Sequence, residues 1–150
     1  MVIYPDTSFL FSLYVVEETT PFAEAYGGGL SEALIFTPFH RLELRVALRL
    51  RVFRGELGLD NLKKAFRDNE EDLAQGFLQH TPLNWSDALR EAERLGEAHL
   101  TETGVRSGDL LHVASAVVLG AREFVTFDQR QTKLARRAGL KVKTWKENRR

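Results

Sequence analysis

Two aspartates occupy matching places in the chain, each directly after a short apolar run. Asp6 follows "VIYP", and Asp128 follows "EFVTF". Aspartate is disfavoured in strands, and an unpaired carboxylate is costly in an apolar interior, so each of these acids needs a partner. Ligands of open parallel sheets collect at the carboxyl ends of the strands. If the two strands are neighbours, both carboxylates point into the same crevice.

Two further acids fall on predicted helices. Asp109 is placed two residues after the expected N-cap, Ser107, where free backbone N–H groups and the helix dipole stabilise a carboxylate. Glu43 lies about 60° from the centre of an apolar helical stripe, near Val46, and therefore edges the expected buried face. Taken alone, Asp109 is more simply explained as a helix-capping residue, and Glu43 as a side chain that reaches solvent.

Together the four acids indicate a metal site. Two carboxylates about 4 Å apart repel by roughly 4 kcal/mol at an effective dielectric constant of 20, so four in one crevice need protons or a cation. Arginines 41, 45 and 49 repeat on a different face of the helix and are poor partners for Glu43. Hard oxygen ligands, without cysteine or clustered histidine, select Mg²⁺ or Mn²⁺ rather than zinc. Such a site activates water and stabilises in-line displacement at phosphorus.

The elements that must position these acids alternate along the chain. Strands are expected over residues 1–5, 33–38, 123–127 and 140–145. They are short and apolar on both faces, which favours a parallel sheet covered by helices. The sequence therefore predicts a three-layer α/β/α sandwich with a central, mainly parallel sheet. No linker or repeat divides the chain, so we expect a single domain over residues 1–150.

Helical patterns fill the segments between these strands. The spacing over 38–54 predicts a helix that buries an apolar stripe: Phe39, Leu42, Val46, Leu50 and Phe53. Residues 56–78 are predicted to form the next helix, followed by a short extended piece over 80–85. The remaining helices are expected over residues 8–18, 20–29, 86–103, 107–120 and 128–139.

Composition limits the classes of function. The 150 residues are 43% hydrophobic and 28% charged, as in an ordinary globular domain. The chain has no cysteine, which excludes disulfides, thiolate metal sites and a cysteine nucleophile and fits a reducing cytoplasm. We see no signal peptide, and no apolar stretch approaches the roughly 18 to 20 residues of a membrane span. The net charge of zero gives no support for a nucleic-acid binder, although residues 122–150 hold 10 basic and 3 acidic side chains.

This arrangement resembles a PIN domain, the metal-dependent nuclease fold, and is most similar to the VapC-type toxins of bacterial and archaeal toxin–antitoxin pairs. The resemblance runs nearly end to end, through "VIYPDTSFL" and "PFHRLELRVAL". Its most specific part is "VRSGDLLHVASAVVLGAREFVTFDQRQTKLARRAGLKV". Pro5 departs from the family, which usually has an aliphatic residue before the aspartate, but the acids themselves are intact.

The resemblance implies a ribonuclease that cleaves RNA with metal-activated water and leaves a 3′-hydroxyl and a 5′-phosphate. The acids match the family's catalytic and metal-binding quartet: Asp6, Glu43, Asp109 and Asp128. Hydroxyl residues at supporting positions would orient the carboxylates or bound water: Thr7, Ser8 and Thr126. The resemblance also implies a homodimer and inhibition by a small antitoxin protein.

An acidic pocket repels RNA, so basic residues must hold the phosphates around it. The candidates for RNA binding are Arg106, Arg130, Lys133 and Arg137, with Arg136, Lys141 and Lys143 as further members of the same rim. Taken alone, each is more simply explained as an ordinary solvated charge. Phe127 and Tyr4 could stack on bases, with core packing as the alternative for both.

Two other interpretations compete with a nuclease. An aspartyl-phosphate phosphatase requires Asp-x-Asp after the first strand, but Ser8 occupies the second position. A response-regulator receiver requires an acidic pair near the first strand, which is missing. A PIN-fold module that binds RNA or protein without cleaving is the non-enzymatic alternative. The zero net charge favours this module slightly, and the full quartet opposes it.

Overall fold

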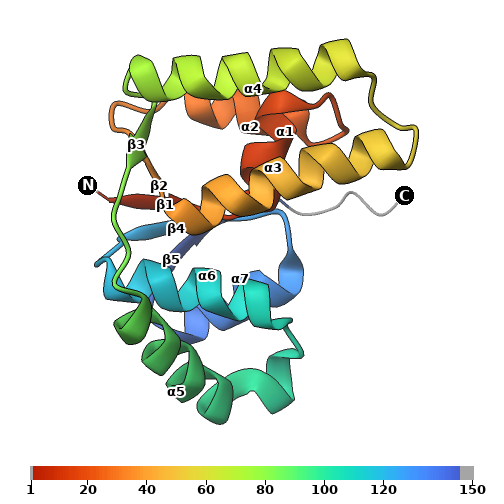
Figure 1. Cartoon of the computed structure of the whole chain (residues 1–150). Coiled ribbons are helices and arrows are strands. Elements are labelled where there is room, and N and C mark those ends of the chain that lie inside the picture. Colours follow the sequence, from red (N-terminus) through yellow and green to blue (C-terminus); the bar gives the residue numbers. More distant parts are fainter. Residues whose placement is uncertain (1, 146–150) are drawn as a thin grey trace. The chain divides into compact units, whose positions relative to one another are not determined.

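The computed structural model describes residues 2–145, which form two compact units (Figure 1). One unit combines Met1–Asp6 with Leu83–Arg150, and the other is Thr7–Pro82. We call them the split unit and the inserted unit. The family resemblance extends over both units. The expectation that residues 1–150 form one domain stays a prediction.

The split unit contains three parallel strands and three helices within its described residues. Its strands are β1 (Ile3–Pro5), β4 (Glu123–Val125) and β5 (Lys141–Lys143), and its helices are α5 (Trp85–Thr103), α6 (Ser107–Val118) and α7 (Gln129–Arg137). Strand β4 lies between its two neighbours, with Ile3 opposite Glu123 and Glu123 opposite Lys141. The core includes Tyr4 and Phe124, whose rings stack with centroids 5.6 Å apart.

The inserted unit contains two parallel strands and four helices. The strands are β2 (Leu34–Phe36) and β3 (Leu78–His80), paired with Leu34 opposite Leu78. The helices are α1 (Thr7–Tyr14), α2 (Thr20–Gly28), α3 (Pro38–Phe53) and α4 (Leu59–Ala74). Helix α1 is apolar almost all round and contacts α2, α3 and α4, which explains why it contributes Phe9 and Leu10 to the core.

The fold class predicted from the sequence is confirmed: short parallel strands alternate with helices throughout residues 2–145. One strand was missed, because residues 56–78 were expected to be wholly helical. Helix α4 instead ends at Ala74, and Gly76 adopts a φ of +82°, a conformation that glycine tolerates best. The chain then enters β3 at Leu78, earlier than the extended piece expected over residues 80–85.

The face that α3 buries was predicted wrongly. His40, Leu44 and Leu48 are buried, whereas Leu42 is 62% and Phe53 is 87% exposed. A local cause is the helix N-terminus: the Thr37 hydroxyl accepts from the His40 backbone N–H, and the His40 ring stacks on Phe36. The expected stripe therefore faces away from the core of this unit. In residues 2–145, no helix is long and apolar enough to cross a membrane.

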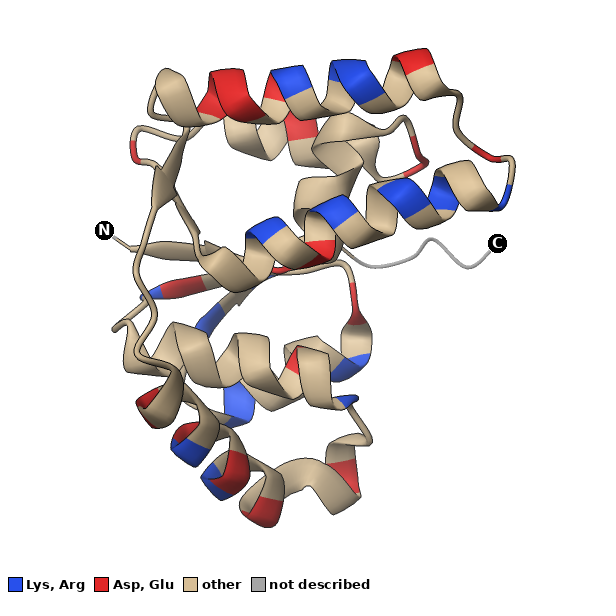
Figure 2. Cartoon of the chain, viewed as in Figure 1, with Lys and Arg blue, Asp and Glu red and all other residues tan. Residues whose placement is uncertain are grey.

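Basic residues recur along α3 (Figure 2), and two of them share one acid of α4. Arg41 and Arg45 each donate to the same Glu70 carboxylate oxygen at 2.8 Å. Arg45 and Arg49 also lie over the Phe66 ring, at 4.6 and 4.8 Å from its centroid. The sequence predicted that these arginines are poor partners for Glu43. Their contacts with Glu70 and Phe66 of α4 agree with that prediction.

Candidate metal-binding active site

Asp6 stands at the end of β1, where its backbone N–H extends the sheet ladder to the Val125 carbonyl at 2.9 Å. Its side chain is buried, at 4% exposure. The Thr126 hydroxyl lies 2.6 Å from Asp6 Oδ2, a short hydrogen bond to a carboxylate. Thr126 itself continues β4 by donating its backbone N–H to the Lys143 carbonyl. The strand pairing therefore places a hydroxyl beside a buried acid.

Asp128 is the N-cap of α7. Its carboxylate Oδ1 accepts from the Gln131 backbone N–H at 3.0 Å, while its own backbone N–H donates to the Thr126 hydroxyl at 3.0 Å. Thr126 thus contacts both Asp6 and Asp128. The sequence placed Asp128 just past its strand, and the capping geometry explains why the carboxylate is held there.

Asp109 lies in the first turn of α6. The expected cap, Ser107, is the first helical residue instead, and Arg106 is the N-cap without a side-chain cap hydrogen bond. The loop before this helix turns at Gly104, whose φ of +64° ends α5 in the left-handed conformation. This sharp turn delivers the start of α6 to the same side of the unit as the start of α7.

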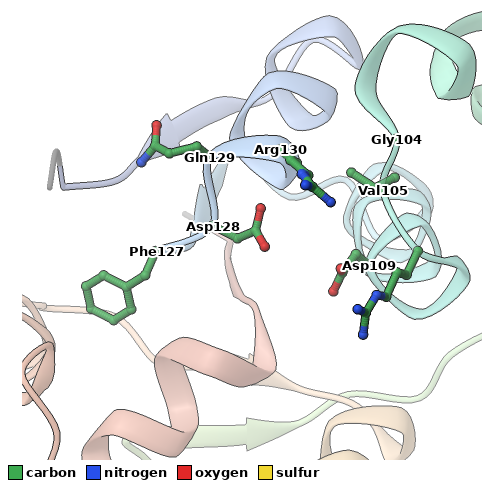
Figure 3. A pocket seen from close by; sticks show the side chains of 8 residues that line it. Gly104, Val105, Asp109, Phe127, Asp128, Gln129 and Arg130 are labelled. Atoms are coloured by element: carbon green, nitrogen blue, oxygen red, sulfur yellow. The ribbon is translucent and has the colours of Figure 1, made fainter.

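Asp109 and Asp128 line one open pocket of about 660 Å³ (Figure 3). Their carboxylates enter it from the first turn of α6 and from the N-cap of α7, whereas the Phe127 ring points away from them. Arg106 and Arg130 are also lining residues. Asp6 joins this pair through Thr126, as described above. Three of the four predicted acids are therefore positioned by connected elements of the split unit.

Glu43, the fourth acid, belongs to the inserted unit. It is half-buried on α3 and accepts a 2.6 Å hydrogen bond from the Thr7 hydroxyl at the start of α1. Thr7 follows Asp6 directly in the chain. Ser8 is exposed, and its carbonyl accepts from the Ser12 hydroxyl. The Thr7 hydroxyl, predicted to support the site, thus contacts Glu43, one of the four predicted acids. A supporting role for Ser8 stays a prediction.

The predicted basic rim divides into two groups. Arg106 and Arg130 line the pocket, and no ion pair within residues 2–145 involves either of them. Lys133 and Arg137 instead contact Glu102 near the end of α5: Lys133 donates to its carbonyl at 3.0 Å, and Arg137 pairs with its carboxylate. The first two residues are therefore better placed to meet a phosphate at the pocket.

The two aromatic candidates for base stacking also differ. Tyr4 is completely buried and hydrogen-bonded to His112 Nδ1 at 2.7 Å, so the core-packing alternative is correct for Tyr4. His112 is itself buried, at 1% exposure, and so belongs to the same core. Phe127 is partly exposed and packs on Trp145, with ring centroids 4.8 Å apart.

Sequence reasoning missed Gln131, a completely buried residue of α7. Its Nε2 lies 3.3 Å from the Asp109 carbonyl, and its Oε1 lies 3.1 Å from the Thr126 hydroxyl. The spacing Asp128-x-x-Gln131 is that of a capping box, and this signal could have drawn attention to it. In the structure its amide turns into the interior instead of capping the helix.

The donor set of the split unit fits a divalent cation of the Mg²⁺ or Mn²⁺ type. Asp6, Asp109 and Asp128 offer carboxylate oxygens, and Thr126 supplies the outer hydrogen bond that orients such ligands. Within residues 2–145, no three His, Asp or Glu side chains already surround a single point as a ready-made metal cluster. The convergence of all four acids on one cation stays a prediction.

Solved structures share this fold over most of the chain. The toxin VapC20 of Mycobacterium tuberculosis, described as cleaving the sarcin-ricin loop, is 14% identical, with a TM-score of 0.67 over 87% of this chain and 93% of its own. The FitAB complex bound to the IR36 DNA fragment is 15% identical, with a TM-score of 0.72 over 99% of this chain and 100% of its own. VapBC2 from Rickettsia felis, bound to a promoter DNA fragment, is 14% identical, with a TM-score of 0.63 over 97% and 100%.

These similarities establish an α/β fold shared with toxin–antitoxin proteins. No curated protein sequence matches the chain significantly. The PIN domain family, however, matches residues 3–137. The chain therefore belongs to the PIN domain family.

Proposed function

We propose that this protein is a divalent-metal-dependent endoribonuclease, the toxin of a VapBC-type toxin–antitoxin pair. The observation that carries the proposal is the linked arrangement of acids in a PIN domain. Asp109 and Asp128 share a pocket, and Asp6 is joined to Asp128 through the Thr126 hydroxyl. The carboxyl ends of parallel strands are where such sheets bind ligands, and a metal ion held there by carboxylates can activate water for hydrolysis.

Asp6, Asp109 and Asp128 would hold Mg²⁺ or Mn²⁺, and by the family resemblance Glu43 would join them. The bound cation supplies an activated water and neutralises charge developing on the scissile phosphate. Thr126 keeps the Asp6 carboxylate in one orientation, and the Thr7 hydroxyl does the same for Glu43. These hydrogen bonds reduce the reorganisation that the acids need before the reaction.

Arg106 and Arg130 are proposed to bind the RNA backbone on either side of the cleaved bond. Both line the pocket that holds Asp109 and Asp128. Their charges offset the repulsion between the acids and the phosphates. Lys133 and Arg137 are assigned a weaker contribution, because both are already engaged by Glu102.

A second copy of the chain and an antitoxin are the proposed protein partners, and the cytoplasm the proposed compartment. The support for self-association is the outward stripe of α3, where Leu42, Val46, Leu50 and Phe53 are all more than 40% exposed. Apolar surface of this kind, repeated along one helix face, favours a protein partner. The complexes named above, VapBC2 and FitAB, support the proposal of an antitoxin.

The test is cleavage of single-stranded and structured RNAs by the pure protein with Mg²⁺, Mn²⁺ or EDTA. Asp6→Asn, Asp109→Asn and Asp128→Asn should each lower the cleavage rate by at least about 100-fold, because each removes a proposed metal ligand. Asp60→Asn, on the exposed first turn of α4, is the matched control. RNA binding without cleavage under every metal condition would instead identify a binding module.

A further inference from the structure

Gln131 is a buried amide with three contacts to the parts of the acidic site. Its backbone N–H donates to Asp128 Oδ1, its Nε2 to the Asp109 carbonyl, and its Oε1 faces the Thr126 hydroxyl. A carbonyl only accepts hydrogen bonds, so the amide NH₂ must be the group facing Asp109. The orientation of Gln131 is therefore fixed by chemistry as well as by packing.

The Thr126 hydroxyl has one proton and two acceptors within reach. Asp6 Oδ2 lies 2.6 Å from its oxygen and Gln131 Oε1 lies 3.1 Å away, while the Asp128 backbone N–H occupies one of its lone pairs. A hydroxyl donates only one hydrogen bond at a time. Because Asp6 is closer and carries a carboxylate, it is the preferred acceptor of that proton in the metal-free protein.

A cation bound by Asp6 weakens this preference without removing it, because each carboxylate oxygen has two lone pairs. The carboxylate then attracts the Thr126 proton less strongly, and Gln131 Oε1 is an acceptor already in place. Without Gln131, the buried Thr126 hydroxyl would lose its second acceptor and the Asp109 carbonyl would lose a donor, and both losses are unfavourable. Gln131 also ties the first turn of α6, through the Asp109 carbonyl, to α7.

We propose that Gln131 is a positioning residue of the acidic site: its amide gives the buried Thr126 hydroxyl a second partner and so fixes the threonine that orients Asp6 for a divalent cation. This inference rests on the proposed function, since it assumes that Asp6 is a metal ligand. It adds a residue that the family resemblance did not suggest. Gln131 acts through Thr126 and Asp109 and does not touch the RNA.

The experiment measures Mn²⁺ binding by calorimetry, without RNA, for the full chain and its variants. Gln131→Met keeps the length and helix preference of the side chain but removes both hydrogen bonds, so Mn²⁺ affinity should fall about 10- to 100-fold. Gln79→Met, the same change at an exposed residue of β3, should leave affinity within about 2-fold. Circular dichroism checks that each variant is folded.

A double-mutant cycle separates positioning from packing. In a Thr126→Val background the hydroxyl is absent, so Gln131→Met should weaken Mn²⁺ binding by less than about 3-fold if Gln131 acts mainly through Thr126. An equal fold-loss in both backgrounds would overturn the inference, as would wild-type affinity in Gln131→Met.

If Gln131→Met does not fold, Gln131→Asn provides the test. Its amide is one methylene too short to reach both Thr126 and Asp109, so affinity should again fall by roughly 10-fold. Unchanged Mn²⁺ affinity in this variant would overturn the inference while leaving the proposed function standing. A wild-type chain that binds no Mn²⁺ would overturn the proposed function, and this inference with it.

Discussion

Replacing Thr126 by valine tests whether one hydroxyl organises the acidic site. The substitution keeps the shape of the side chain and removes its hydrogen bonds to Asp6 and to the Asp128 backbone N–H. A hydrogen bond to a charged group contributes about 1.5 to 3 kcal/mol, and an unsatisfied N–H costs about 1 to 3 kcal/mol. Because the two share one oxygen they are not additive, and we expect a loss of about 2 to 4 kcal/mol in the free energy of unfolding.

The assay pairs urea denaturation with RNA cleavage in Mg²⁺. Thr126→Val should also slow cleavage about 10- to 100-fold, as expected for an outer partner of a metal ligand. Thr126→Ser retains the hydroxyl and loses only a methyl group, so it should cost about 1 kcal/mol and keep most of the activity. Wild-type stability and cleavage in Thr126→Val would refute the reasoning, because the hydroxyl would then be dispensable.

Three further predictions concern stability, RNA binding and assembly. Burial raises the pKa of Asp72, and the hydroxyl of Tyr14, 2.6 Å away, partly lowers it. A carboxyl with a raised pKa contributes stability at low pH that is lost as pH rises through its folded pKa. Tyr14→Phe removes this hydrogen bond and raises the pKa of Asp72 further. The loss in free energy of unfolding, measured by urea denaturation, should therefore be about 1 to 2 kcal/mol larger at pH 7 than at pH 3. Equal losses at the two pH values would contradict this. Replacing Arg106 and Arg130 by alanine should weaken RNA binding, measured by fluorescence anisotropy. The slope of log affinity against log salt concentration should fall in magnitude by about 0.7 for each phosphate that is no longer neutralised. An unchanged slope would argue against phosphate binding by these arginines. Val46→Glu, which puts a charge on the exposed stripe of α3, should shift the protein to monomers in sedimentation, whereas a wild-type chain that is already monomeric would remove the proposed homodimer.

The acids of the split unit could be located from the sequence because their positions follow from local rules. A strand ended by proline precedes Asp6, and a strand-to-helix boundary precedes Asp128, so both lie where parallel strands end. The first turn of a helix likewise fixed the place of Asp109. These features depend on neighbours in the chain, which periodicity and turn chemistry describe well.

The buried face of α3 could not be chosen from the sequence because the helix has apolar residues on two faces. Leu44 and Leu48 form the shorter set, yet they are buried together with His40. The longer stripe, which includes Val46, contains more apolar residues, so helical periodicity favours it. Burial is decided by contacts with other elements and by partners, which a single helix pattern does not contain.

Gln131 shows the same limit at the level of one side chain. A glutamine in the first turn of a helix reads as a capping residue, and only the tertiary structure shows its amide directed at Thr126 and the Asp109 carbonyl. The pairing of Lys133 and Arg137 with Glu102 is also a contact between distant segments. Sequence spacing alone could not divide the basic residues into those at the pocket and those beside it.

The most direct test of the account is a calorimetric titration of the metal-free protein with Mn²⁺. The account predicts saturable binding that weakens at least about 10-fold in Asp6→Asn and in Asp128→Asn, and that Asp60→Asn leaves unchanged. Equal Mn²⁺ affinity in all four proteins, or no saturable binding by the wild type, would contradict the claim that these carboxylates hold a divalent cation together.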